Sequence, residues 1–499
     1  MNRESADSRT DEFMRNISYG SPIEYVRELM QSPVDIFVPN ALAENYECQC
    51  LIFTTVNELV RLGEYCPTIR IHMPATTISA GLPLISDGNF VEATVSWVRD
   101  LPYQPDLVFL DHHAEHPFVQ ICIRDYLINL ACSGWSVHLS LSSEPMWGRT
   151  LPVIACIASS WLVAEIIKIL LSPIVPGVRV TMDTCFNFWD YTTSASYAEL
   201  PLSPLKIPDA ILVGAGGIGS AVVYALLQQR DILGGLTLVD DDLIDNSNLN
   251  RVLYAREENA GDAKADLAHL LLVQYTHLTT VSEKRKWGEY VRSHRNDLCL
   301  VLGAVDEDLI RQSIQSDLPK IYVDGGTGIN NWRVSRHNML EDGCIYCLTH
   351  SDTTDGMLAD LRMAGILESA ISYRTDTNSP FSAEDLIYVP DELKTYFKDQ
   401  RPQDGWRRFK ESVHCGEITY LVGQHMSAPH LSSMPGFIMA LELIKGSMVN
   451  LSANQDWNVV LGNLNGTFNT RSASKMKSSQ CPFCGRLDYV DGYRLRWNL

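Results

Sequence analysis

The glycine-rich segment near the middle of the chain constrains the fold more than any other stretch. Apolar residues 211–213 predict a short strand, and Gly214, Gly216 and Gly219 follow in G-x-G-x-x-G spacing, with Gly217 between them. A helical pattern begins at once. In such a turn, bare backbone approaches a polyphosphate at the N-terminus of a helix. The segment therefore predicts a Rossmann-like α/β nucleotide-binding domain, although dinucleotide dehydrogenases use the same glycine spacing.

The residues after the next strand separate a triphosphate site from a dinucleotide site. Apolar residues 236–239 predict this strand, which ends at Asp240, where a carboxylate can bind ribose hydroxyls. Asp242 follows, and the next loop and helix add an amide, a guanidinium and an ammonium from Asn248, Arg251 and Lys264. A dehydrogenase that holds a pyrophosphate does not need these three groups. An enzyme that cleaves a triphosphate does.

Together these elements resemble the ThiF/MoeB superfamily of adenylyltransferases, which includes the ubiquitin-activating enzymes. The family pattern is a glycine turn, D-x-D, S-N-L-x-R, a lysine one short helix later, and an aspartate after a further strand. This chain matches with Asp240 and Asp242, residues 247–251, Lys264, and Asp306 after the apolar run 298–302. It departs from the pattern in two places: Asn250-Arg251-Val252 replaces the usual Q-R-Q, and Glu307 follows Asp306 where the family has an asparagine. Neither departure removes a charged group.

The resemblance implies that the chain uses ATP to adenylate a carboxylate, which in the family is the C-terminal glycine of a ubiquitin-like protein. Arg251 and Lys264 would be catalytic, because fixed positive groups must meet the charge that develops on the phosphate oxygens. The glycine turn would hold the phosphates and Asn248 would orient them. No general base is required, since the carboxylate is already ionised near neutral pH.

The two carboxylates at the strand ends have separate implied roles. Asp240 would bind the ribose of ATP, and Asp306 would bind Mg²⁺, with Asp242 near the metal.

Composition limits the classes of partner. The formal net charge of −20 argues against a phosphate-backbone partner, so we expect no nucleic acid. The most membrane-like run, 151–175, contains Glu165 and Lys168 one turn apart, which would be costly in lipid, so we expect a buried helix and no membrane span. The 13 cysteines follow no signal peptide and favour a reducing, cytoplasmic compartment.

Two apolar helical segments suggest a duplicated unit. Residues 161–173 and 437–448 each carry a glutamate and a lysine three positions apart, Glu165 with Lys168 and Glu442 with Lys445. Upstream of each, an apolar strand precedes an aspartate, Asp111 in one copy and Asp306 in the other. Two unrelated amphipathic core helices remain the alternative, because Glu-x-x-Lys is common.

The first copy has neither the glycine turn nor the S-N-L-x-R box, so it could not hold a triphosphate. We expect residues 1–205 to form an inactive adenylation-like domain with a proline-rich linker, joined to the active domain as half of a pseudo-dimer. In the resembled family the partner half often supplies an arginine to ATP, and Arg15 and Arg27 are the candidates. The active domain would comprise 206–350 and 425–499.

Two C-x-x-C pairs, separated by about 130 residues, predict a zinc site. Four thiolates leave no open coordination position, so this zinc would be structural, bound by Cys344, Cys347, Cys481 and Cys484. Redox use of either pair is the alternative. The histidine-rich stretch 111–116 would also suffice for zinc or manganese, but a solvated turn is favoured because no distant ligand is evident.

A long segment of weak periodicity, 351–424, separates the two parts of the expected active domain. In the family, a crossover loop here carries the catalytic cysteine. Cys415 is the only cysteine of this segment, and His414, Arg407 and Arg408 could favour its thiolate. The thiolate would take the acyl group as a thioester and pass it to a conjugating enzyme. A small hydrophobic residue ahead of a strand is the alternative.

The sequence thus favours an activating enzyme for a ubiquitin-like protein, with ATP, Mg²⁺ and Zn²⁺ as cofactors and a homodimer as an open option. Two alternatives remain. One is an adenylyltransferase that activates a sulfur carrier or a peptide C-terminus without a thioester, and the other is an NAD-binding Rossmann protein. Because 15 residues follow Cys484, we expect no C-terminal ubiquitin-fold domain. Such compactness suggests a bacterial conjugation system, some of which act in antiviral defence.

Overall fold

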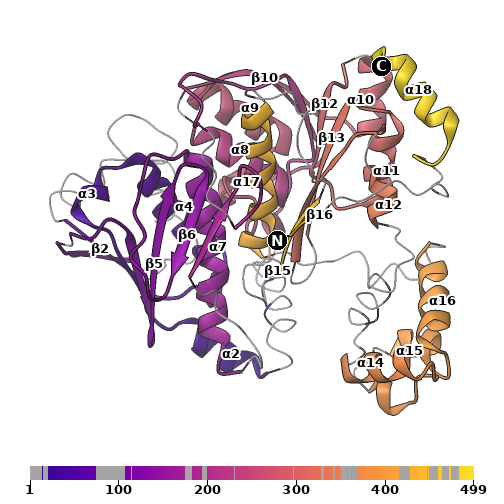
Figure 1. The fold of residues 1–499 in the computed structure, drawn as a ribbon, viewed down its shortest axis with the longest axis horizontal. Coiled ribbons are helices and arrows are strands. Elements are labelled where there is room, and N and C mark those ends of the chain that lie inside the picture. Colours follow the sequence, from indigo (N-terminus) through magenta and orange to yellow (C-terminus); the bar gives the residue numbers. More distant parts are fainter. Residues whose placement is uncertain are drawn as a thin grey trace. The chain divides into compact units, whose positions relative to one another are not determined.

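The computed structural model describes residues 21–499 with Thr10 and Met14, apart from shorter gaps and those at 75–106, 175–182, 194–198, 350–356, 415–427, 449–458, 464–470 and 474–480. The chain divides into two compact units, Met1–Ile345 with Met426–Leu499, and Tyr346–His425. The larger unit holds two β-sheets and the helices that cover them (Figure 1).

The glycine-rich segment lies in a nine-stranded sheet. Its parallel part has the order β11-β10-β9-β12-β13, which β14, β15 and β16 continue in antiparallel fashion, while β8 pairs with β10. Strands β9 and β12 are buried along their whole length, as expected for central parallel strands. The strands are β8 (Leu205–Lys206), β9 (Ala210–Val213), β10 (Ile232–Val239), β11 (His277–Glu283), β12 (Leu300–Gly303), β13 (Ile321–Thr327), β14 (Asn331–His337), β15 (Val459–Asn463) and β16 (Arg471–Ala473).

Two helices of the second half of the chain, which contains the nine-stranded sheet, pack closely on each other. A side chain at Gly436 in α17 would overlap the carbonyl oxygen of Ile218 in α8, so the glycine permits the close crossing. The second half contains α8 (Gly217–Leu227), η3 (Asn246–Asn248), η4 (Glu257–Asn259), α9 (Lys264–Tyr275), α10 (Trp287–His294), α11 (Asp308–Ser316), α17 (Pro429–Gly446) and α18 (Leu487–Trp497).

The first half of the chain forms a seven-stranded sheet in the order β3-β2-β1-β4-β5-β6-β7. Strands β1 to β3 are parallel, and β4 to β7 run antiparallel to their neighbours. The elements are α2 (Ile23–Met30), β1 (Val34–Phe37), α3 (Asn40–Ala43), α4 (Tyr46–Val60), η1 (Gly63–Tyr65), β2 (Ile69–Met73), β3 (Leu107–Asp111), β4 (Val119–Ile123), β5 (Tyr126–Ser133), β6 (Ser136–Ser140), α7 (Pro152–Leu171) and β7 (Thr184–Asn187).

The two sheets agree in part of their topology. If the two-residue strand β8 is left out, each sheet has its first three strands in the order 3-2-1, with α4 or α8 after the first of these strands and α7 or α17 before a late antiparallel strand. The expected match between Asp111 and Asp306 is wrong, because β3 lies at the edge of its sheet whereas β12 pairs with β9. An apolar strand followed by an aspartate is a local pattern, and it does not specify which neighbour the strand pairs with.

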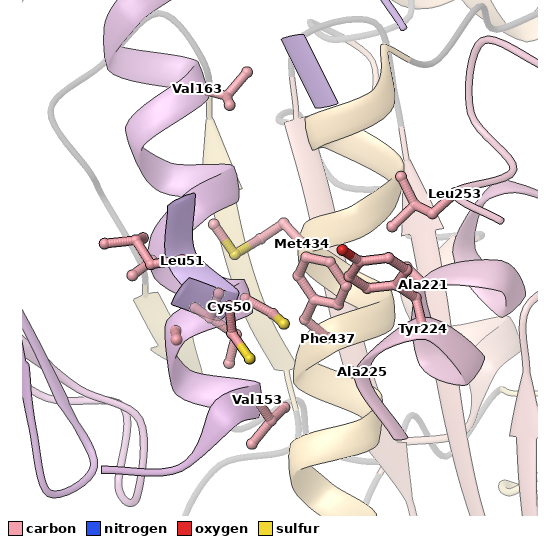
Figure 2. Close-up of a cluster of buried hydrophobic side chains, with 14 of the residues drawn as sticks. Cys50, Leu51, Val153, Val163, Ala221, Tyr224, Ala225, Leu253, Met434 and Phe437 are labelled. Carbon is pink, nitrogen blue, oxygen red and sulfur yellow. The ribbon is translucent and has the colours of Figure 1, made fainter. Parts of the chain in front are cut away.

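The two halves share one hydrophobic core. Figure 2 shows side chains from α4 and α7 facing those of α8 and α17, among them Cys50, Leu51, Val153, Tyr224, Met434 and Phe437. Helix α7 is long and apolar enough to span a membrane, but 94% of its apolar window is buried within the protein. This agrees with the expectation of a buried helix for this run.

Each of the two long core helices carries a buried ion pair at the same spacing. Lys168 Nζ lies 2.5 Å from Glu165 Oε1 in α7, and Lys445 Nζ lies 2.7 Å from Glu442 Oε1 in α17. Burial lowers the pKa of both lysines, and the paired glutamates oppose that shift. Tyr191 also donates a hydrogen bond to Glu442 Oε1 at 2.6 Å. The Glu442 carboxylate is therefore held inside the core by a partner from its own helix and by Tyr191 from the segment after β7.

The smaller unit has its own apolar core. Its described elements are α14 (Glu368–Asp376), η5 (Glu384–Leu386), α15 (Asp391–Phe397) and α16 (Pro402–His414), and α12 (Ile345–Thr349) crosses the boundary between the units. The core includes Leu361, Ile371, Phe381, Phe397 and Phe409. Cys415 lies outside the described residues, one position after α16 ends.

Loss of one partner of a buried pair should destabilise the protein strongly. We predict that Glu442→Ala costs about 3–5 kcal/mol of stability, because the Lys445 ammonium keeps its burial and loses its carboxylate. Urea unfolding followed by tryptophan fluorescence measures the loss. The matched control is Asp488→Ala, which removes an exposed pair with Arg486 and should leave the unfolding midpoint nearly unchanged. Equal losses in both variants would contradict this account.

Candidate functional site

The glycine turn joins β9 to α8 through backbone contacts that only glycine permits. Gly214 has a φ of +91°, and a Cβ there would lie 2.7 Å from the carbonyl oxygen of Ala304, just beyond β12. A Cβ at Gly219 would overlap the carbonyl oxygen of Gly214. A Cβ at Gly216, the N-cap of α8, would meet nothing within 4 Å. The turn is thus tightly packed on its inner side and open at Gly216, where an anion can approach the helix N-terminus.

Asp240 links the end of β10 to the glycine turn. Its Oδ2 accepts a hydrogen bond from the Ala215 N–H at 2.5 Å, and its Oδ1 accepts one from the Asp242 N–H at 2.8 Å. Burial raises the pKa of Asp240, while the Ala215 N–H and Lys264 oppose the rise. Each carboxylate oxygen can accept a further bond, so this position is compatible with ribose binding.

Lys264 lies at the start of α9 and closes the loop that begins at Asp242. Its Nζ is 2.8 Å from Asp242 Oδ2, and its backbone N–H donates to the Asp242 carbonyl at 3.1 Å. The side chain of Lys264 is 10% exposed and that of Asp242 is 68% exposed. The ammonium is therefore held at the carboxyl edge of the sheet by an exposed acidic partner.

The S-N-L-x-R segment forms the short helix η3 and the turn after it. Asp245 caps η3 by accepting from the Ser247 N–H at 2.7 Å, and Asn248 Oδ1 accepts from the Asp245 N–H at 3.2 Å. Arg251 donates to the Ser247 carbonyl at 2.8 Å. A Cβ at Gly217 would lie 3.1 Å from Arg251 Cδ, so this arginine lies against the glycine turn.

Asp306 follows β12 on the other side of the glycine turn and is exposed. The Ala304 N–H donates to the Val213 carbonyl at 2.8 Å, which fixes the end of β12 beside the end of β9. Arg311 donates to the Asp306 carbonyl at 3.5 Å and pairs with the buried Asp324 at 3.2 Å. Within the described residues, carboxylate oxygens of Asp240, Asp241 and Asp242 lie within 4.8 Å of one another. Asp306 does not belong to this cluster.

A family model for ThiF matches residues 203–483, which include every element of this site. The chain belongs to the ThiF family. An uncharacterised protein, y4jF, from Sinorhizobium fredii is 24% identical over 387 residues, 74% of each chain. The tRNA threonylcarbamoyladenosine dehydratase of Escherichia coli is 36% identical over 75 residues, 15% of this chain and 27% of that one. Crystal structures of E. coli MccB with ATP, and with MccA-N7isoASN, have TM-scores of 0.35 and 0.36 at 14% identity, covering 56% of this chain and 67% of MccB.

Membership of the ThiF family agrees with the sequence-based recognition, and the α/β class with a Rossmann-like sheet is confirmed. In this family member the residues expected at the nucleotide come from the ends of β9, β10 and β12, the edge where open α/β sheets bind ligands. Their individual roles toward ATP remain predictions.

The four cysteines of the two C-x-x-C pairs come together, as the sequence predicts. All four are buried, and their sulfur atoms lie within 4.8 Å of one another. Cys344 Sγ is 3.4 Å from Cys481 Sγ, and the Phe483 N–H points to Cys481 Sγ at 3.4 Å. The pairs adjoin the start of α12 and the start of α18.

The histidine-rich stretch 111–116 does not gather into a ligand cluster within the described residues. His116 donates to the Phe118 carbonyl at 2.7 Å and stacks on that ring, while His113 contacts Asn40 at 3.3 Å.

Among the described residues, an arginine that the first half brings to this ThiF-family site is one that the sequence did not predict. Arg27 pairs with Glu64 at 2.9 Å, and Arg15 lies outside the described residues. Arg61, directly after α4, instead donates to carbonyl oxygens of the loop around Arg251. No sequence motif indicates this contact, because its acceptors are backbone atoms far along the chain. Arg61 and Leu249 are 188 positions apart.

Two glycine substitutions should distinguish the contribution of the turn to stability from its contribution to ATP binding. We predict that Gly219→Ala destabilises the protein by about 1–3 kcal/mol, because its methyl group overlaps a backbone carbonyl. Gly216→Ala should keep the melting temperature but weaken ATP binding, because its methyl group enters the open side of the turn. Thermal unfolding with and without ATP measures both effects. Unchanged ATP affinity in Gly216→Ala would show that the nucleotide lies elsewhere.

Proposed function

We propose that this chain is an ATP-dependent adenylyltransferase that activates the C-terminal carboxylate of a ubiquitin-like protein and then carries it as a thioester. One observation carries the adenylation step. An open glycine turn, a ribose-compatible carboxylate and two cations, Arg251 and Lys264, lie at one edge of the sheet in a member of the ThiF family. A dinucleotide site does not need those two cations, so the NAD-binding alternative lacks comparable support.

In the proposed reaction a carboxylate oxygen forms a bond to the α-phosphorus of ATP. The bond from that phosphorus to the bridging oxygen breaks, and pyrophosphate leaves. Arg251 beside Gly217 and Lys264 at the start of α9 would meet the charge on the phosphates. Asp306 would hold Mg²⁺, which would supply further neutralisation of the phosphates, although its carboxylate does not join the cluster of Asp240, Asp241 and Asp242.

Lys264 provides the direct test of this step. We expect Lys264→Ala to lower ATP–pyrophosphate exchange by about 10²–10³-fold, because one fixed charge at the phosphates is lost. Exchange is measured with a purified ubiquitin-like protein as the carboxylate donor, and the melting temperature confirms the fold. Lys284→Ala is the matched control, since Lys284 pairs with Asp266 at 2.8 Å on the exposed side of α9. Retained exchange in Lys264→Ala would refute the assigned role.

The second proposed step places the acyl group on Cys415. The thiolate, once its proton has left to solvent, attacks the carbonyl carbon of the acyl adenylate, and AMP leaves as the thioester forms. Support comes from the sequence alone, since Cys415 follows α16 outside the described residues. The thioester would pass to a conjugating enzyme.

The thioester should be visible as a covalent adduct. We expect a non-reducing gel to show a thiol-sensitive adduct between this chain and the ubiquitin-like protein, and Cys415→Ala to abolish it without lowering pyrophosphate exchange. Cys299→Ala is the control, because Cys299 is an exposed thiol on the described surface. Full turnover in Cys415→Ala would favour the alternative, an adenylyltransferase that stops at the acyl phosphate on a peptide or a sulfur carrier.

We further propose that residues 1–205 are an inactive copy of the adenylation domain and that 206–350 with 425–499 are the active one, with 351–424 as the crossover segment. Three features support this proposal: the shared 3-2-1 strand order, the equivalent helices α4 and α8, and the equivalent helices α7 and α17 with their buried pairs. No glycine turn follows β1, where Val38-Pro39 leads into α3.

We propose a structural zinc ion at the four cysteines. In a tetrahedral site with Zn–S bonds of about 2.3 Å the sulfur atoms are roughly 3.8 Å apart, so the observed cluster needs little adjustment. Thiolate ligands, like a thioester-forming cysteine, require a reducing environment, which supports the proposed cytoplasmic location.

Zinc content tests the cluster. We expect one zinc per chain by elemental analysis, and Cys481→Ser should release it and lower the melting temperature, because the metal ties α18 to the start of α12. Cys185→Ser, at a half-buried thiol of β7, is the control and should keep the zinc. A metal-free, equally stable wild-type protein would contradict the proposal.

A further inference from the structure

Arg61 brings a buried guanidinium from the first half of the chain to the loop that carries Arg251. It follows the last residue of α4, and it is 4% exposed. Its Nη1 donates to the carbonyl oxygen of Leu249, and its Nη2 donates to those of Leu253 at 2.8 Å and Ala255 at 3.4 Å. One side chain thus binds main-chain acceptors on both sides of Arg251.

Asn57, one turn earlier on α4, completes this contact. Its Oδ1 accepts from Arg61 Nε at 3.1 Å, and its Nδ2 donates to the Leu253 carbonyl at 3.1 Å. Asn57 is fully buried. The amide therefore orients the guanidinium and binds one of the same acceptors.

The opposite side of the loop is held by α8. Ser220 Oγ accepts from the Leu253 N–H at 3.3 Å, and its single proton lies between the Gly217 carbonyl at 2.9 Å and the Arg251 carbonyl at 3.4 Å. The main chain of residues 249–255 is therefore fixed between a helix of the first half and a helix of the second. The side chain of Arg251 lies against Gly217, one residue after Gly216, where the glycine turn is open.

The planar, charged guanidinium of Arg61 suits a position that faces several backbone carbonyls better than a lysine ammonium would. Burial lowers the pKa of Arg61 to about 9, so the guanidinium is still charged at neutral pH. A guanidinium directs several donors in fixed directions in one plane, whereas a lysine ammonium offers a compact charge that cannot reach several separated carbonyls at once. Hydrogen bonds from a charged donor are also stronger than those from a neutral one.

We propose that Arg61, oriented by Asn57, is a positioning residue for adenylation: it sets the main-chain path that aims Arg251 at the triphosphate. This inference rests on the proposed function for its catalytic consequence. The first half of the chain would then contribute to the reaction through Arg61. This side chain would act on the backbone around Arg251 and would not contact the nucleotide itself.

A double-mutant cycle with Arg251 tests the proposal on the full-length chain. We expect Arg61→Met to lower kcat for ATP–pyrophosphate exchange by about 100-fold, the size of effect that a misplacement of about 1 Å can have, with a much smaller change in KM for ATP. Arg61→Lys should recover only part of the loss. In the Arg251→Ala background, Arg61→Met should cost nothing further, because Arg61 acts through Arg251.

Arg124→Met is the matched control. Arg124 also lies in the first half and donates to a backbone carbonyl, that of Leu29, at 3.3 Å, but it is exposed. This variant should exchange pyrophosphate at the wild-type rate. An equal loss from Arg61→Met in both Arg251 backgrounds, or full activity of Arg61→Met, would overturn the proposal.

Hydrogen–deuterium exchange separates failure of this inference from failure of the proposed function. Peptides that cover 249–255 should exchange faster in Arg61→Met than in the wild type, while peptides from β9 and β12 stay protected. If the wild type catalyses no pyrophosphate exchange, the proposed function fails, and this measurement still decides whether Arg61 holds the loop. Unchanged protection of 249–255 would overturn the inference even in an active enzyme.

Discussion

The packing of α4 and α7 against α8 and α17 is the contact on which the rest of the larger unit depends. It buries side chains of both sheets in a single core, and the close crossing of α8 and α17 requires the missing side chain of Gly436. Because α8 begins inside the glycine turn, its position sets where the helix N-terminus points. The backbone amides of the site are therefore held by the same contact that joins the two halves.

The buried ion pairs of α7 and α17 lie in this shared core, and one of them also connects the two halves. A buried ion pair gains little over apolar residues of similar volume, because both ions lose their hydration. Pairs nevertheless occur at the same spacing in α7 and α17, at 2.5 Å and 2.7 Å. In α17 the carboxylate also binds Tyr191, which follows β7 of the first sheet, so this pair links the halves by polar contacts as well as apolar ones.

Local sequence patterns predicted the parts of the site that are local in space. The glycine spacing gave the turn, the strand end gave Asp240, and a lysine at the start of a helix closed on Asp242 because both lie at one edge of a parallel sheet. The four cysteines were also predictable, since thiol pairs at two-residue spacing have few other uses. The strand order of the first sheet was not, because the match of Asp111 to Asp306 used only what precedes an aspartate and not which strands pair.

Arg61 shows why another part of the site was out of reach of the sequence. Its partners are carbonyl oxygens, which every residue has, so the acceptors leave no mark on the amino-acid sequence. The donor is equally unremarkable, an arginine at the end of an apolar helix, where a charge near the C-terminus is common. Such a contact becomes visible only when the fold turns the carbonyls of Leu249 and Leu253 toward one point. A search for a guanidinium that contacts ATP directly therefore overlooks one that binds the backbone. In this chain the first half reaches the site through such backbone contacts of Arg61.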